Sequence, residues 1–171
     1  MMRGSAIILV LPPSPRTFRA ARGFVLDDWS KLMSEQAIGI EKLQELITRG
    51  PFNRWLNFKV TKVDEEGIEV KAAWREEWVV NPDRRYTHGG ILGAIIDVAA
   101  DYAIAARIGR PVPTIDIRVD FHKAAMPGDL VAKARVVRIG SQYSTAEASV
   151  YDKDGELVAS GRGTYFTASP K

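Results

Sequence analysis

Three residues at the start of one apolar stretch have the types and the spacing that chemistry requires. His88, Gly89 and Gly90 open the stretch, and from Gly89 to Ala106 almost every residue is Ala, Ile, Leu, Val or Gly. If the stretch is a helix, both glycines place free backbone N–H groups and the positive end of the helix dipole at its tip. Such a tip can stabilise a carbonyl oxygen that gains negative charge. The two glycines could also serve only to allow a tight turn into the helix.

Asp97 lies in the middle of the same apolar stretch. Burying a carboxylate among apolar side chains costs free energy unless the group is paired or functional. Asp97 is therefore either satisfied by an arginine or a backbone donor, or it takes part in a reaction. Asp101 follows four residues later and shares a helix face with Asp97. We expect Asp101 to be structural, paired with Arg107 or with an arginine across an interface.

The hydrophobic pattern of the stretch Tyr86–Arg107 predicts the element that holds these groups. Apolar residues face all directions, which is typical of a helix surrounded by protein. The stretch is long enough to span a membrane, but Asp97 and Asp101 would be costly in hydrocarbon. We therefore expect a buried helix and no membrane association.

The rest of the chain predicts a sheet around this helix. Residues 36–49 have apolar residues at helical spacing and end at Gly50-Pro51, which predicts an amphipathic helix. The predicted strands are Trp55–Val63, Ile68–Trp74, Pro113–His122, Leu130–Ile139, Ser144–Tyr151 and Glu156–Phe166. Because short turns link most of them, we expect an α+β domain in which one curved antiparallel sheet of about six strands wraps around one long central helix.

Composition and charge limit the possible functions. The chain of 171 residues has no cysteine and two histidines, which excludes disulfides and a cysteine nucleophile and argues against a metal site. Its net charge is +3, yet residues 1–24 hold four arginines and no acid, which leaves 20 of the 24 basic residues against all 21 acidic ones. The near-neutral remainder predicts no nucleic-acid partner. We expect no metal.

Residues 1–35 differ from the rest of the chain. We expect a poorly ordered extension there, followed by a domain of residues 36–171. The apolar run Ala6–Leu11 is too short for a membrane helix and short for a signal-peptide core. The arginine-rich, acid-free start also has the character of an organellar transit peptide, and Met33 could be the true start of translation. A cytoplasmic protein is expected, with an organellar location as the alternative.

Several motifs in order along the chain carry a family resemblance. They are Asn81, the His88-Gly89-Gly90 helix start with Asp97 nine residues after the histidine, Pro113-Thr114, Phe121, the turn Ala125–Asp129 and the Asp154-Gly155 hairpin. Over roughly residues 37–168 this pattern resembles the hotdog-fold acyl-CoA thioesterases of the phenylacetate-degradation (PaaI-like) type. The resemblance implies a hotdog fold, dimers and commonly tetramers, and hydrolysis of an acyl-CoA thioester. No cofactor is implied, because coenzyme A is part of the substrate.

The resemblance also implies a role for each matched residue. Asp97 would be the general base that activates water, or the nucleophile that forms a transient anhydride. The N–H of Gly89 would be the oxyanion donor, His88 would orient the loop or the thioester, and Thr114 would position the attacking group. Asn81 lies seven residues before the histidine, whereas the family asparagine lies six before it, so the match requires one extra loop residue.

Further substrate contacts are expected at strand ends and beside the helix tip. The residues expected to bind substrate are Gly90, Phe121, Lys123, Arg138, Gly140 and Ser141. The phosphates of coenzyme A need cations or backbone N–H groups, which Lys123 and the Arg138–Ser141 turn could supply. Phe121, with Phe52 or Trp55, would suit an aryl or medium-chain acyl group, although core packing would explain these aromatic residues equally well.

A distance argument predicts the quaternary structure. The nine residues from His88 to Asp97 span roughly 13 Å of helix, too far for both ends to reach one carbonyl carbon within about 3 Å. Two antiparallel helices from neighbouring subunits could place Gly89 of one beside Asp97 of the other, as the family does. We expect a homodimer, or a dimer of dimers, with two composite sites per dimer.

Two other functions fit a domain of this kind. A non-catalytic acyl-CoA-sensing module would usually carry a DNA-binding helix pair, which residues 1–35 do not convincingly offer. A hotdog hydratase or dehydratase would act on related thioesters with a histidine and an acid in motifs unlike this one. Thioester hydrolysis is the preferred interpretation.

Overall fold

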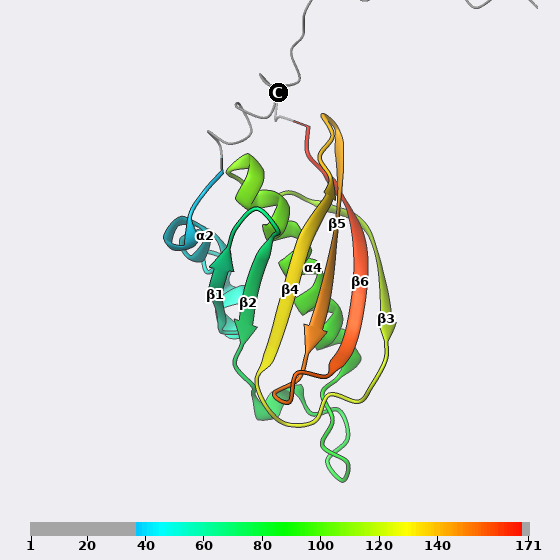
Figure 1. Cartoon of the computed structure of the whole chain (residues 1–171). Coiled ribbons are helices and arrows are strands. Elements are labelled where there is room, and N and C mark those ends of the chain that lie inside the picture. Colours follow the sequence, from blue (N-terminus) through cyan, green and yellow to red (C-terminus); the bar gives the residue numbers. More distant parts are fainter. Residues whose placement is uncertain (1–36, 169–171) are drawn as a thin grey trace, which may run out of the picture.

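A six-stranded antiparallel sheet curves around one long helix (Figure 1). The computed structural model describes residues 37–168. The central helix is α4 (Gly89–Ile108), and the strands are β1 (Phe58–Val63), β2 (Ile68–Ala72), β3 (Thr114–Phe121), β4 (Leu130–Arg138), β5 (Tyr143–Tyr151) and β6 (Leu157–Phe166). The strand order is β1-β2-β4-β5-β6-β3, and each neighbouring pair is antiparallel. The predicted α+β architecture is confirmed. The predictions for residues 1–35 lie outside the described residues.

The central helix begins and ends where the sequence provides caps. His88 is the N-cap, and its Nδ1 accepts the N–H of Gly90 at 2.8 Å. At the other end Gly109 adopts a left-handed conformation with φ 77°, which a glycine adopts without strain, and its N–H donates to the carbonyl of Ala105. Between these caps the helix lies in the concave face of the sheet, and its apolar side chains form the core with β4, β5 and β6 (Figure 1). No helix within residues 37–168 is long and apolar enough to cross a membrane.

Small residues on the inner face of the sheet let the helix approach closely. The strands present buried alanines to α4, and β6 presents glycines. A Cβ atom on Gly161 would lie 2.7 Å from Cγ2 of Ile96 on α4 and 2.5 Å from the carbonyl oxygen of Arg118 on β3. Neither distance is compatible with a side chain, so the packing of α4 against β6 requires glycine at this position.

Two short helices precede β1 in the chain, and the first of them packs on the β1 edge of the sheet. The first is α2 (Ile40–Ile47), where an amphipathic helix was predicted, and the amide side chain of its Gln44 bonds to the free edge of β1 through the Phe58 carbonyl (3.0 Å) and the Val60 N–H (2.7 Å). The second is α3 (Pro51–Trp55), where the sequence predicted a stop and the start of a strand. Proline ends one helix but is also well suited to the first turn of the next, which explains the difference.

The opposite edge strand, β3, contains a β-bulge that changes which side chains face the helix. Thr114 pairs with Tyr165 and Asp116 with Thr164, so Ile115 is an extra residue in β3. The bulge shifts the alternation by one, and Thr114 joins Ile117 on the inner face. Strict alternation would place Thr114 and Ile117 on opposite faces, so the bulge is what brings Thr114 to the inner face.

We expect Gly161→Ala to lower the free energy of unfolding by about 1–3 kcal/mol, because the added methyl group has no space between Ile96 and the β3 backbone. Gly93→Ala is the control: the nearest atom to its new Cβ is Cγ2 of Val119 at 3.9 Å, and alanine favours a helix. Urea unfolding of both variants at one protein concentration measures the difference. Equal stability of the two would contradict the close packing of α4 on β6.

Candidate active site

Asp97 is held by two hydroxyl groups from two different strands. Its Oδ1 accepts a hydrogen bond from Oγ1 of Thr114 on β3 at 2.8 Å and from the hydroxyl of Tyr165 on β6 at 3.3 Å. Within residues 37–168 Asp97 forms no ion pair, and its Oδ2 has no hydrogen-bond partner. The side chain is half-buried. Neither an arginine nor a backbone donor satisfies this carboxylate, and one of its oxygens is available to react.

Tyr165 is the member of this group that the sequence analysis missed. It is fully buried, with 0% of its surface exposed, and its ring lies over Gly163, where a Cβ would be 2.6 Å from the hydroxyl. Burial, followed by the negative charges of Asp97 and Asp101, raises the pKa of the Tyr165 phenol well above its usual value. Tyr165 therefore stays protonated and remains a donor. In the sequence, Tyr165 follows Gly163 on a predicted strand, which is a weak signal for a buried tyrosine. Its position opposite Thr114 depends on the bulge, which the sequence does not reveal.

The tip of α4 presents one free N–H group. The Gly90 N–H is taken by Nδ1 of His88, whereas the Gly89 N–H has no acceptor in the part of the chain that the structure describes. The tip is fixed to the body by the His88 N–H, which donates to the carbonyl of Trp78 at 2.7 Å. Gly89 rather than Gly90 thus has the geometry of an oxyanion donor. Because Nδ1 accepts, neutral His88 carries its proton on Nε2.

Phe121 lies against this tip. Its ring atoms would be 3.2 and 3.3 Å from a Cβ on Gly89, and 59% of the residue is exposed. Of the aromatic residues suggested for an acyl pocket, Phe121 is the one beside Gly89. Phe52 and Trp55 stack on each other in α3, which leads into β1, and β1 and β3 are the two opposite edges of the sheet, so one chain does not bring these residues to Phe121.

Gly89 and Asp97 stay apart within one chain. Eight residues of helix separate them by about 12 Å. The inner face and free edge of β3 beside them are apolar and exposed: Ile115 is 56%, Ile117 36% and Phe121 59% accessible. Gly89 and Asp97, the two groups of the predicted site, therefore both lie beside a surface of α4 and β3 that nothing within residues 37–168 covers.

Comparison with known proteins identifies the family. A family model described as the thioesterase superfamily matches residues 85–159, which hold the tip of α4, Asp97 and Thr114. The X-ray structure of a protein from the thioesterase superfamily is 48% identical, covers 74% of this chain and 96% of its own, and superposes with a TM-score of 0.73. This chain belongs to the thioesterase superfamily.

Two sequence relatives agree with this placement. A candidate esterase of Halobacterium salinarum is 38% identical over 94 residues, which are 49% of this chain and 62% of that protein, so the match spans less than two thirds of the relative. The medium/long-chain acyl-CoA thioesterase YigI of Escherichia coli is 23% identical over 151 residues, with 79% of this chain and 96% of that protein covered. The predicted family, a superfamily of thioester hydrolases, is confirmed.

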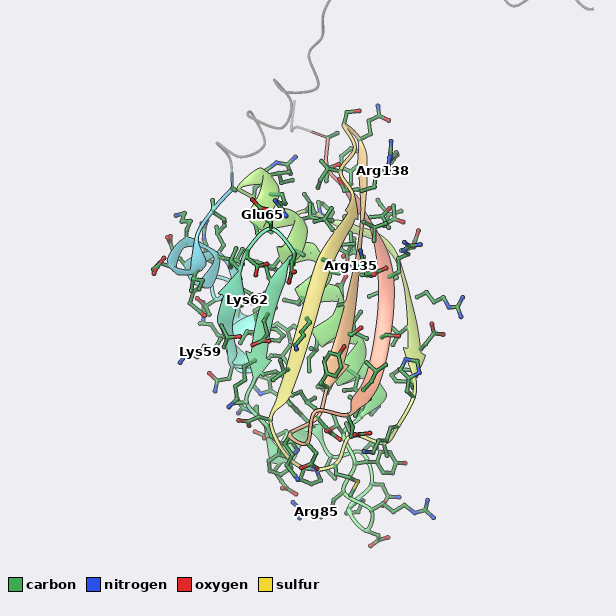
Figure 2. All side chains as sticks on the ribbon, in the orientation of Figure 1. Lys59, Lys62, Glu65, Arg85, Arg135 and Arg138 are labelled. Atoms are coloured by element: carbon green, nitrogen blue, oxygen red, sulfur yellow. The ribbon has the colours of Figure 1, made fainter. Side chains whose placement is uncertain are left out.

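The residues expected to bind coenzyme A in this thioesterase superfamily member lie at two ends of the sheet. Lys123 follows β3 near the tip of α4, where it lies 3.5 Å from Asp152. Arg138 ends β4 at the opposite end of the sheet, as Figure 2 shows. Gly140 and the exposed Ser141 follow it, and the Gly140 N–H donates to Ser144. One chain therefore does not bring Lys123 and the Arg138–Ser141 turn together.

Asn81 lies in the loop before α4. Its side-chain oxygen accepts the N–H groups of Asp83 and Arg84, both at 2.9 Å, which is an Asx turn that shapes the loop. One chain does not bring Asn81 into contact with Asp97. Its catalytic role stays a prediction.

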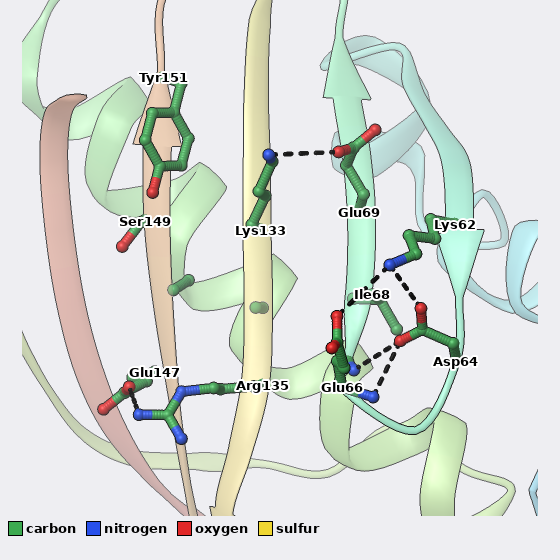
Figure 3. Close-up of a pocket in the computed structure, with 13 residues that line it drawn as sticks. Lys62, Asp64, Glu66, Ile68, Glu69, Lys133, Arg135, Glu147, Ser149 and Tyr151 are labelled. Atoms are coloured by element: carbon green, nitrogen blue, oxygen red, sulfur yellow. Dashed lines mark hydrogen bonds and ion pairs between the residues drawn. The ribbon is translucent and has the colours of Figure 1, made fainter. Parts of the chain in front are cut away.

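The groove drawn in Figure 3 is not part of this site. It has a volume of about 340 Å³ and lies on the outer face of the sheet, lined by paired charges such as Lys133 with Glu69 and Arg135 with Glu147. Because these charges neutralise each other, the groove favours no charged ligand. No cluster of metal-ligating side chains occurs among residues 37–168.

Asp101 is paired differently from the prediction. Its Oδ1 accepts the backbone N–H of Val112 at 2.8 Å, whereas Arg107 donates to the carbonyl of Glu65. The expected pair with Arg107 is wrong, because Asp101 accepts a loop N–H that no side-chain pattern reveals. A pair with an arginine across an interface stays a prediction. The bond to Val112 fixes the connection between α4 and β3 two residues before Thr114. Burial, with a further contribution from the charge of Asp97, raises the pKa of Asp101 to about 7 despite the Val112 hydrogen bond.

We expect the stability gained by Asp101→Asn to depend on pH. The folded pKa of about 7 exceeds the ordinary value of 3.8, so ionised Asp101 destabilises the fold progressively from about pH 4 to pH 7 and fully above it. The variant keeps an acceptor for Val112. Its stability relative to wild type should fall by about 2 kcal/mol between pH 8 and pH 5. Urea unfolding measures it, with exposed Asp154→Asn as the baseline; a pH-independent difference would count against burial of the charge.

Proposed function

We propose that this protein hydrolyses an acyl-CoA thioester to a free acid and coenzyme A. The observation that carries the proposal is the state of Asp97: a half-buried carboxylate in an apolar helix, with Oδ1 held by two hydroxyls and Oδ2 without a partner among the described residues. Membership of the thioesterase superfamily supports it, as does the name of the Escherichia coli relative.

The geometry suits either of two routes at Oδ2. As a general base, Asp97 takes a proton from water, the hydroxide attacks the thioester carbon, and the proton passes to the departing thiolate. As a nucleophile, Oδ2 attacks the carbon, the thiolate leaves, and water hydrolyses the resulting anhydride. In both routes the Gly89 N–H stabilises the oxygen that becomes negative. Both therefore need the same two groups.

We propose that these two groups come from different subunits of a homodimer. The helix geometry supports this, because about 12 Å separates Gly89 from Asp97 in one chain. The apolar, exposed inner face of β3 beside them also supports it, since a second copy would cover such a surface. An antiparallel pair of α4 helices would bring Gly89 of one subunit to Asp97 of the partner subunit.

The same pairing would assemble the coenzyme A contacts. In an antiparallel dimer, Lys123 of one subunit and Arg138 of the partner subunit lie toward one end of the assembly, although they are far apart within a chain. Their charges suit phosphates. The acyl group would lie against Phe121, whose exposed ring suits an aryl or medium-chain substrate.

We expect Asp97→Asn to reduce kcat by at least about 100-fold, because asparagine can accept from Thr114 and Tyr165 but is neither a base nor a nucleophile. Release of free thiol from a panel of aryl- and alkyl-CoA thioesters, followed with a disulfide-exchange dye, measures it. Asp154→Asn, in an exposed hairpin, should retain wild-type turnover. Near wild-type turnover of Asp97→Asn would overturn the assignment. Acyl-CoA binding by the wild type without thiol release would indicate a sensing module.

We expect two inactive variants to restore activity when co-expressed. Gly89→Pro removes the oxyanion donor, yet proline fits the first helical position and His88 before it has a compatible ψ of 132°. A mixed dimer with Asp97→Asn would hold one intact site, so a random mixture should show about a quarter of wild-type turnover. Gly89→Ala, which keeps the N–H, should remain active alone. Active homodimers of wild type with no recovery in the mixture would show that the site lies within one chain.

A further inference from the structure

We propose that Tyr165 is a positioning residue for this reaction: with Thr114 it holds Oδ1 of Asp97 so that Oδ2 alone faces the reacting group. The inference rests on the proposed function, because it assigns Tyr165 a part in that same site. Neither the family resemblance nor the motifs around α4 point to this tyrosine, which lies on the last strand, 68 residues from Asp97.

The first support is that two donors converge on one oxygen from two strands. Thr114 on β3 lies 2.8 Å and Tyr165 on β6 lies 3.3 Å from the same Oδ1. The Tyr165 hydroxyl is also 3.3 Å from the backbone carbonyl oxygen of Asp97, so it could donate to either atom. The carboxylate is charged and is the stronger acceptor, so we assign the hydrogen bond to Oδ1.

The second support is that the fold makes room for this hydroxyl at two places. A side chain on Gly163 would lie 2.6 Å from the hydroxyl and 2.8 Å from the ring of Tyr165. The bulge at Ile115 places Thr114 opposite Tyr165 in the sheet. Burying a phenol hydroxyl is unfavourable unless it is bonded, and its acceptors within residues 37–168 are both atoms of Asp97. An apolar residue would fill this space without that requirement.

Fixing Oδ1 gives Oδ2 a defined position. A carboxylate can rotate about the bond that joins it to the rest of the side chain, and this rotation exchanges its two oxygens. Donors on one oxygen prevent that rotation, so water or the thioester carbon meets an oxygen that is already aligned, with no reorganisation during the reaction.

We expect Tyr165→Phe to lower kcat about 10- to 100-fold and to change KM by less than about 3-fold, because the ring and the substrate contacts remain while one hydrogen bond to a charged group is lost. Tyr143→Phe, an exposed tyrosine on β5, is the matched control.

Two further variants separate positioning from packing. Thr114→Ser keeps a hydroxyl and should retain most of the turnover, whereas Thr114→Val should lose as much as Tyr165→Phe. The double variant Tyr165→Phe with Thr114→Val should lose more than the product of the two single effects, because either hydroxyl alone still restrains the carboxylate. If the two substitutions had independent, multiplicative effects on kcat, the proposal that both hydroxyls restrain Oδ1 would be contradicted.

A readout without substrate keeps this test distinct from that of the proposed function. In protein labelled with ¹³C-aspartate, the chemical shift of the Asp97 carboxyl carbon at one fixed pH should change in Tyr165→Phe and keep its wild-type value in Tyr143→Phe. If wild type releases thiol but Tyr165→Phe keeps its kcat and its Asp97 carboxyl chemical shift, the positioning role is wrong and hydrolysis stands. If no thioester is hydrolysed but that chemical shift changes, the contact is real and the proposed function fails.

Discussion

One charged group in an apolar helix determines how this domain is put together. Asp97 would be costly inside α4 without donors, and the donors come from β3 and β6 rather than from an arginine. These hydrogen bonds tie the middle of the helix to the two strands at one side of the sheet. Because both hydroxyls bond to Oδ1, Oδ2 has no hydrogen-bond partner among residues 37–168. The same contacts that satisfy the group leave it able to react.

The close packing of helix and sheet follows from this requirement. A hydroxyl on β6 can reach Asp97 only if α4 lies near that strand, and Gly161 and Gly163 provide the space. Asp101 adds a second fixed point, because its bond to Val112 sets where β3 begins relative to the helix. The burial that raises the pKa of Asp101 to about 7 is therefore a cost of holding the Thr114 end of β3 in place.

Local patterns in the sequence predict the parts of this structure that depend on neighbouring residues. The apolar run predicts the helix α4, and alternation with turns predicts six strands. An acid in the middle of that apolar run singles out Asp97 as a functional candidate. Tyr165 could not be predicted, because its contact depends on the register of β3 on β6, which one extra residue at Ile115 sets. The predicted pair of Asp101 with Arg107 was wrong for a related reason: Asp101 accepts the backbone N–H of Val112. Contacts that depend on register or on backbone groups leave no residue-type signal.

The two edges of the sheet differ in a way that bears on assembly. Unpaired edge strands expose hydrogen-bonding groups and are usually covered. At the β1 edge, Gln44 of α2 bonds to the strand much as a neighbouring strand would. Among the described residues nothing covers β3 in this way, although Ile115, Ile117 and Phe121 are exposed there. The open edge is also the one that carries Thr114 and lies beside Gly89. The open edge therefore supports the proposed dimer, in which a second copy would cover β3 and bring its Gly89 to Asp97.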